Sequence, residues 1–123
     1  MKKLILPHSI GVLLALLVFV AFPSSSALAS PKCGDVVFSM HTVGVAIVVS
    51  MTSTTPSPYI IFYTVNSTDP VHSGPNVGNS DTHIYTTPIS VGPGQSVYFR
   101  ALTYKAAPYV DSNITEETVT NEK

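Results

Sequence analysis

The amino-acid sequence predicts an all-β protein, an antiparallel β-sandwich of about seven strands. Three short runs of apolar, β-branched and aromatic residues lie in the second half of the chain, at 59–64, 84–91 and 97–105. Pro, Gly, Asn or Ser residues bound each run, which is typical of strands joined by tight turns. Turn signals recur at short intervals along the chain, and this spacing favours a sandwich.

The first half of the chain continues this pattern. A short first strand is expected at 35–39. The run 43–51 is almost entirely apolar, and its β-branched side chains favour a buried strand because they lose χ1 freedom in a helix. Two prolines in 52–58 then end regular structure. Further strands are expected at 59–65, 83–85, 89–91, 96–104 and 114–120.

The strand at 96–104 is the longest of these and has two distinguishable faces. Arg100 is expected to mark a solvated face. The residues that alternate with it should therefore point into the core: Val97, Phe99, Ala101 and Thr103. The polar segment 66–81 exceeds the usual length of a connection in a small domain, and long loops often carry function. The alternatives are a functional loop and a disordered one, and this segment is the first place to look for a site.

The first 29 residues match the pattern of a secretory signal peptide. Lys2 and Lys3 form its basic region, and an unbroken apolar run covers 11–22. Small residues at 27–29 suit signal peptidase. A helix over the apolar run would span roughly 18 Å, less than the roughly 30 Å hydrocarbon core. We expect a signal helix cleaved near Ala29 or Ser30 and a secreted protein without a stable membrane span; the alternative is an uncleaved helix that anchors it.

The remainder is long enough for one small domain. We divide it into a lead-in at 30–42, with the first strand, and a sandwich module at 43–123. Without Lys2 and Lys3, four basic residues face seven acidic ones, a formal net charge of −3. This balance gives no basic patch and argues against nucleic acid as a partner. Cys33 is the single cysteine, so an internal disulfide is excluded. The alternatives for it are a free thiol near a flexible start, an intermolecular bridge or lipid attachment.

Several motifs together resemble one known family. Tyr63-Thr64 ends a strand, the turn at 66–70 follows, and Tyr85 precedes Pro88-Ile89 and Val91. The segment 100–105 then carries Arg, Ala and a closing Lys. In order and spacing these resemble the chitobiase/β-hexosaminidase C-terminal domain, a small Ig-like, fibronectin type III-like module, over roughly 43–119. The residues that match the family's turn motif are Tyr63, Thr64, Asn66, Ser67, Asp69 and Pro70, with Asn66 in place of the family's Asp and Ser67 in place of its Gly.

The resemblance implies an Ig-like sandwich and an accessory role beside secreted hydrolases or surface proteins. It brings no catalytic residues and no cofactor. The sequence also lacks the G-x-S-x-G pattern of a nucleophile elbow. We therefore expect a secreted, non-catalytic accessory or interaction module rather than an enzyme.

Two groups of residues are candidates for a binding site. Metal-capable side chains gather in and beside the long loop, where oxygen and imidazole groups suit calcium or zinc: Asp69, His72, Asp81 and His83. The second group shares the face of the strand 96–104 that we expect to be exposed: Tyr98, Arg100 and Tyr104. Tyrosine rings suit sugar stacking and protein recognition. The alternative function is therefore a small carbohydrate-binding module, and the expected partner is an extracellular glycan or another surface or secreted protein.

Overall fold

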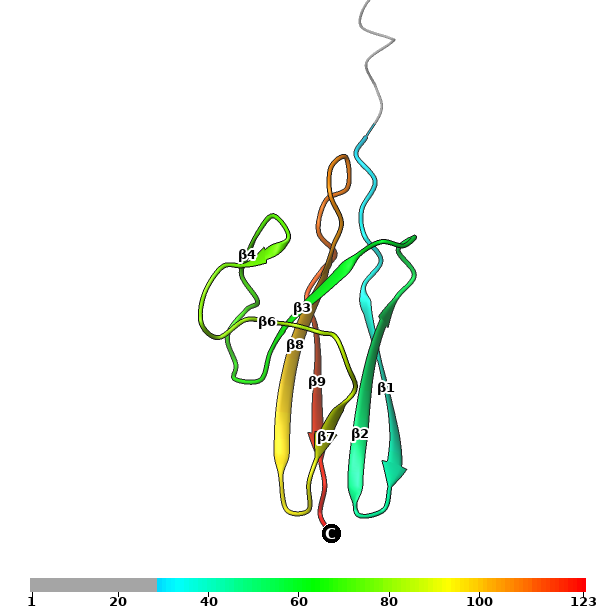
Figure 1. Cartoon of the computed structure of the whole chain (residues 1–123), viewed down its shortest axis with the longest axis vertical. Helices are drawn as coiled ribbons and strands as arrows, with labels where there is room; N and C mark the ends of the chain where they lie inside the picture. The colour runs from blue at the N-terminus through cyan, green and yellow to red at the C-terminus, as the bar shows by residue number, and fades with distance from the viewer. Residues whose placement is uncertain (1–28) are drawn as a thin grey trace, which may run out of the picture.

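The computed structural model describes residues 29–123, and these form β-strands without any helix (Figure 1). The long axis of the molecule runs along the strands, with the C-terminus at one end. The nine strands are β1 (Val36–Val43), β2 (Ala46–Ser53), β3 (Ile60–Thr64), β4 (His72–Ser73), β5 (Asn76–Val77), β6 (His83–Ile84), β7 (Ile89–Val91), β8 (Ser96–Tyr104) and β9 (Thr115–Thr120).

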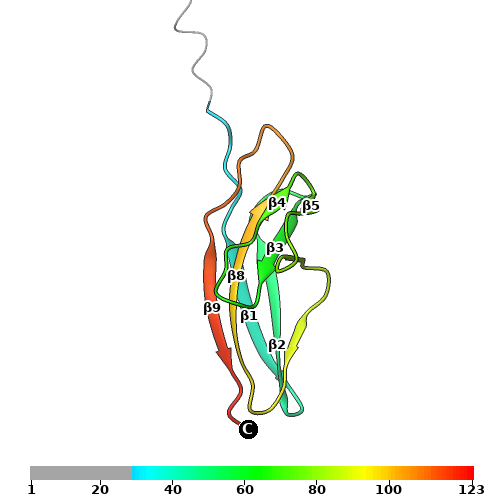
Figure 2. The same cartoon turned by 90° about the vertical axis from the view of Figure 1, so that its left-hand side faces the viewer.

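Seven of these strands make two antiparallel sheets, which confirms the all-β prediction. One sheet has the order β1-β2-β7 and the other β6-β3-β8-β9, while β4 and β5 form a separate two-stranded hairpin. The two larger sheets face one another in a sandwich-like arrangement (Figure 2). Non-consecutive neighbours in both sheets make the pairing non-local, so much of the fold depends on contacts between distant parts of the chain.

A hydrophobic core fills the space between the two sheets. Phe99 of β8 is fully buried there, with its ring centroid 5.9 Å from that of Phe38 in the opposite sheet. Val49 of β2 and Val91 of β7 are equally buried. The inward face predicted for 96–104 is confirmed, because Phe99, Ala101 and Thr103 are fully buried and Val97 packs, partly buried, against the core. The remaining members of the core are Val36, Met51, Ile61 and Val119.

The first hairpin differs from the prediction. β1 extends to Val43 and pairs with β2 over its whole length, from Val36 opposite Ser53 to Val43 opposite Ala46. A two-residue turn begins at Gly44, whose φ of +61° suits glycine at the first central position of a type II′ turn. The strands predicted at 35–39 and 43–51 are therefore both present, but the turn between them lies at 44–45, and residues 36–42 of the expected lead-in belong to the sandwich.

The segment 65–82 folds back over the outer face of β3 and β8. It contains the β4–β5 hairpin, which turns at Gly74 with a φ of +57°. The His72 ring stacks on Phe62 with centroids 4.9 Å apart and planes 9° from parallel, and Phe62 is fully buried. The prediction that Arg100 marks a solvated face is wrong for this reason, since that face is largely covered and Leu102 on it is 6% exposed.

The chain before β1 is also fixed to the sandwich. Lys32 and Val110 form a parallel bridge, and the Cys33 backbone N–H donates to the Val110 carbonyl at 2.9 Å. Cys33 is 3% exposed and has no disulfide partner. Cys33 is therefore a free thiol, as one of the alternatives had it. The flexible start expected around it is wrong, because the fold encloses this residue. The same burial counts against an intermolecular bridge through Cys33.

The predicted signal peptide, residues 1–29, lies outside the described residues except for Ala29. Within the described part of the chain, no helix is long and apolar enough to cross a membrane.

Candidate functional site

A mostly apolar cleft of about 520 Å³ opens at the end of the molecule opposite the C-terminus. Three parts of the chain that are distant in sequence form its walls: the β2–β3 connection at 54–59, the β8–β9 connection at 105–114 and the tip of the β4–β5 hairpin (Figure 1). We call it the tyrosine cleft, and it is lined by Pro58, Tyr59, Ile60, Pro75, Tyr104, Lys105, Ala106, Ala107, Pro108 and Tyr109.

Lys105 fixes two of these walls to each other. Its ammonium group donates hydrogen bonds to the carbonyl oxygens of Pro56 at 3.0 Å and Pro58 at 2.9 Å. It also lies 5.4 Å from the centre of the Tyr109 ring, within the range of a cation–π contact. Because an ammonium group has three N–H donors, one remains after the two carbonyl bonds. Lys105 thus holds the β2–β3 connection against the end of β8 and keeps a donor at the cleft.

His72 fixes the third wall. Its Nε2 lies 2.6 Å from a carboxylate oxygen of Asp111 in the β8–β9 connection, and its Nδ1 lies 3.0 Å from the Gly74 carbonyl. Both partners are acceptors, so both bonds form together only when both ring nitrogens carry hydrogen. Tyr104 packs against the same ring, with centroids 4.8 Å apart. The hairpin that carries Pro75 is therefore attached to the connection that carries Tyr109.

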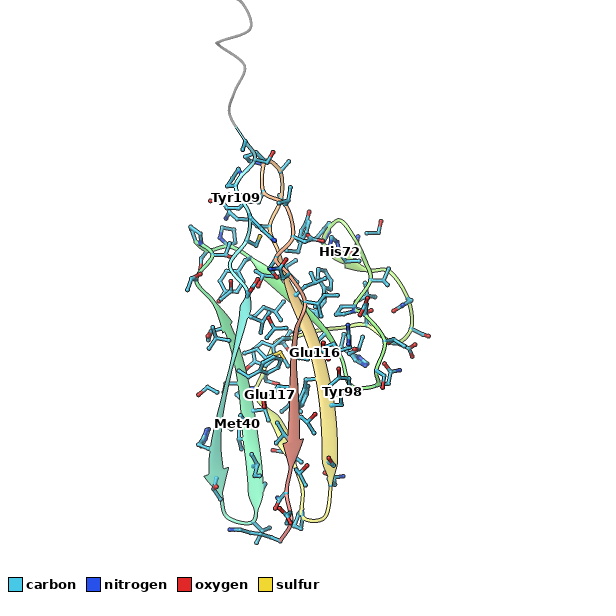
Figure 3. All side chains as sticks on the ribbon, turned by 180° about the vertical axis from the view of Figure 1, so that it is seen from behind. Met40, His72, Tyr98, Tyr109, Glu116 and Glu117 are labelled. Atoms are coloured by element: carbon cyan, nitrogen blue, oxygen red, sulfur yellow. The ribbon has the colours of Figure 1, made fainter. Side chains whose placement is uncertain are left out.

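The three residues predicted as a ligand-binding surface are divided between two environments. Tyr104 lines the tyrosine cleft. Arg100 instead bonds within the protein: its guanidinium contacts the Asp69 carboxylate at 2.5 Å, Glu116 at 3.1 Å and the Tyr98 hydroxyl at 3.1 Å. Figure 3 shows Tyr98 and Tyr109 at separate levels along the molecule. Tyr98, Arg100 and Tyr104 therefore do not form one continuous binding face.

The predicted metal ligands are not brought together either. Asp69 pairs with Arg100, and His72 pairs with Asp111. His83 packs beside Tyr63 with ring centroids 5.4 Å apart, and Asp81 is exposed on the loop. Among residues 29–123, no three His, Cys, Asp or Glu side chains lie close enough together to hold a metal ion. These four residues do not form a centre in this structure.

The predicted turn motif has a structural role. Thr64 is fully buried and its hydroxyl donates to the Thr68 carbonyl at 2.6 Å. The Asn66 side-chain oxygen accepts from the Thr68 hydroxyl at 2.6 Å, and Pro70 is buried. No non-glycine residue in the described chain has a positive φ, so Ser67 needs no left-handed backbone in place of glycine. The motif shapes the start of the segment that covers β3.

Tyr63 of this motif has a raised pKa. Burial of its phenol against the core is the main cause, and repulsion from Tyr85 adds to it. The folded-state pKa thus lies above the ordinary value of 10.0. Its contribution to stability is present below pH 10 and is lost as the pH rises from 10 through the folded-state pKa.

We expect urea unfolding to show a steeper loss of stability above pH 10 in the wild-type protein than in Tyr63→Phe, which keeps the ring and removes the titrating group. Equal slopes for wild type and Tyr63→Phe would contradict this assignment.

Sequence reasoning missed most of the cleft. It singled out Tyr104 but not Tyr59, Tyr109 or Lys105. One signal was available: the dipeptides Pro58-Tyr59 and Pro108-Tyr109 each lie in a connection between predicted strands. What the pattern lacked was the strand order, because only the pairing of β3 with β8 brings the two dipeptides to the same end.

Comparison with models of known protein families, with curated proteins and with solved structures gives no match.

Proposed function

We propose that this protein is a secreted, non-catalytic, Ig-like recognition module and that the tyrosine cleft is its binding surface. In a constant-type Ig domain, strands A, B, E and D form one sheet and C, F and G the other. In chain order, the seven strands of the two large sheets correspond to A, B, C, D, E, F and G. β6 corresponds to strand D, which pairs with strand E in a constant-type Ig domain. Here β6 pairs with β3, the equivalent of strand C, so the two sheets have the orders A-B-E and D-C-F-G. Exchange of this one short edge strand is compatible with an Ig-like sandwich.

The resemblance to the chitobiase/β-hexosaminidase C-terminal domain supports the accessory role. The residues behind that resemblance form strands and turns: Tyr63 and Thr64 in β3, Ile89 and Val91 in β7, and Arg100 in β8. A module specified in this way supplies a scaffold, and its binding residues belong to the connections between strands.

The position of the cleft is the observation that carries this proposal. The B–C and F–G connections are two of the three that contact antigen in Ig variable domains. Here the same two connections, 54–59 and 105–114, place Tyr59 and Tyr109 in one cleft. Its volume of about 520 Å³ lies within the usual range for ligand pockets. Tyrosine is enriched in antibody binding loops, because its rigid ring gives contact area at little entropic cost.

Tyr109→Ala tests this function directly. We would measure binding of the wild-type protein to a panel of secreted-protein peptides and extracellular polysaccharides, and then repeat each positive result with the variant. Loss of a central tyrosine should weaken binding at least about tenfold. Val110→Ala, an exposed neighbour outside the cleft lining, is the matched control and should bind normally. Positive results that Tyr109→Ala leaves unchanged would place binding elsewhere and contradict the proposal.

A further inference from the structure

We propose that the tyrosine cleft binds an extended, proline-rich segment of a partner protein in the polyproline II conformation; this rests on the proposed function and names the ligand class. Such segments dock in grooves lined by aromatic side chains, because the preformed helix loses little entropy on binding. The cleft combines three tyrosines with three prolines and two alanines, so apolar rings and methyl groups form most of its wall.

The hydrogen-bonding character of the cleft distinguishes between ligand classes. Its polar side chains are the phenols of Tyr59, Tyr104 and Tyr109 and the ammonium of Lys105, all of which can donate. The Tyr59 hydroxyl accepts from the Ser53 backbone N–H of β2 at 3.4 Å, so Tyr59 contributes its ring to the cleft rather than a donor. Among residues 29–123, no carboxylate or carboxamide side chain lines the cleft. The lining is therefore mainly apolar, and its few polar side chains are phenols and one ammonium rather than carboxylates or amides.

A proline-rich segment complements this arrangement. Each proline presents a backbone carbonyl that accepts a hydrogen bond and has no backbone N–H that needs an acceptor. The remaining N–H of Lys105 and the phenols of Tyr104 and Tyr109 can donate to such carbonyls, while the tyrosine rings contact the pyrrolidine rings. An ordinary peptide would instead bury N–H groups against a wall with few acceptors, and each unpaired donor costs affinity.

A sugar fits this cleft less well than a proline-rich segment. A sugar residue carries several hydroxyl groups, each both donor and acceptor, and burying them without partners costs free energy. The carbohydrate alternative needs side chains that accept as well as donate, and the cleft lining offers only the phenol oxygens for that role. The mainly apolar lining thus favours proline over sugar.

The cleft is also held in shape before any ligand arrives. Lys105 ties the β2–β3 connection to the end of β8, and the His72–Asp111 pair ties the hairpin to the β8–β9 connection. The Cys33 backbone N–H donates to the Val110 carbonyl and the Val110 N–H donates to the Pro31 carbonyl, so the segment before β1 also holds this connection in place. A wall fixed in this way loses little freedom on binding, which suits a stiff ligand.

The test is a titration of the 15N-labelled protein with three probes, followed by NMR. The probes are an N-acetylated, C-amidated proline octamer, a Gly-Ser octamer of the same length, and a hexamer of N-acetylglucosamine. We expect only the proline octamer to shift the backbone amides at Tyr59, Tyr104, Lys105 and Tyr109, with a Kd below about 1 mM. Tyr109→Ala should weaken this binding at least about tenfold, and Lys105→Met several-fold.

Two further variants keep the test independent of folding. Tyr109→Phe keeps the ring and removes the donor, so it should bind more weakly than wild type and more tightly than Tyr109→Ala. Val110→Ala should bind like the wild type, and the spectrum of each variant reports whether it is folded.

The outcomes separate this inference from the proposed function. If the sugar hexamer shifts the cleft amides and the proline octamer does not, the ligand class is wrong while the cleft remains a binding site. A proline octamer that shifts amides elsewhere also overturns the inference. If no probe shifts the cleft and no ligand from the broader panel depends on Tyr109, both the ligand class and the proposed function are overturned.

Discussion

Phe99→Ala should lower the free energy of unfolding by about 3–5 kcal/mol. Phe99 is fully buried at the centre of the core, and its ring centroid lies 5.9 Å from that of Phe38 and 6.3 Å from that of Tyr63. Alanine removes the apolar area of the ring and leaves a cavity that two hydrogen-bonded sheets cannot easily close. A domain of this size has roughly 5–15 kcal/mol of stability in total, so the loss is a large share of it. Urea unfolding followed by fluorescence or circular dichroism measures the change.

Phe38→Ala is the matched control for this prediction. It removes the same side chain from the opposite sheet of the same core, but Phe38 is only partly buried. Its loss should therefore be smaller than that of Phe99→Ala. Equal losses for the two variants would mean that the core is not centred on Phe99 as the structure has it.

His72→Ala should cost about 1.5–3 kcal/mol and should also weaken binding at the tyrosine cleft. The ring covers Phe62, which is fully buried, and pairs with Asp111 at 2.6 Å. Alanine exposes the Phe62 ring and releases the hairpin that carries Pro75. Hydrogen exchange should show faster opening of the segment 65–82, while the amides of β1 and β2 stay protected.

A double-mutant cycle with Asp111→Ala separates the pairing from the stacking. The two single variants share one hydrogen bond, so their effects on unfolding should not add, and the interaction energy should be about 1–2 kcal/mol. Simple additivity would show that the pair contributes nothing and that His72 acts only by covering Phe62. Asp81→Ala, on the exposed part of the same segment, should leave stability unchanged.

The strands were the most predictable part of this protein. β8 occupies the residues predicted for it, because alternation along 96–104 is strong and Gly92-Pro93-Gly94 and a loop bound it. The first hairpin was not predicted, since Val43 and Val45 on either side of Gly44 make the apolar run look continuous. The turn that separates the two strands begins at Gly44, whose φ is +61°.

The site was less predictable than the strands because it depends on long-range pairing. Arg100 on an outward-facing position suggests a solvated surface, yet Asp69, thirty-one positions earlier, folds over and pairs with it. His72 has the appearance of a metal ligand in the sequence, and Asp111, which gives it a structural role instead, lies in another connection. Local patterns give residue types and periodicity, whereas partners of this kind follow only from the order of strands in the sheets.

Because Cys33 is buried, the rate at which its thiol is modified can report local opening of the unlabelled protein. As the single cysteine and 3% exposed, it should react with a thiol reagent only when the segment bonded to Val110 separates from the sandwich. When closing is fast relative to modification, the modification rate measures the free energy of that opening without any added label. Because Val110 follows Tyr109 directly, a ligand that holds the β8–β9 connection in place should slow the reaction, so one thiol can detect occupancy of a cleft that it does not touch.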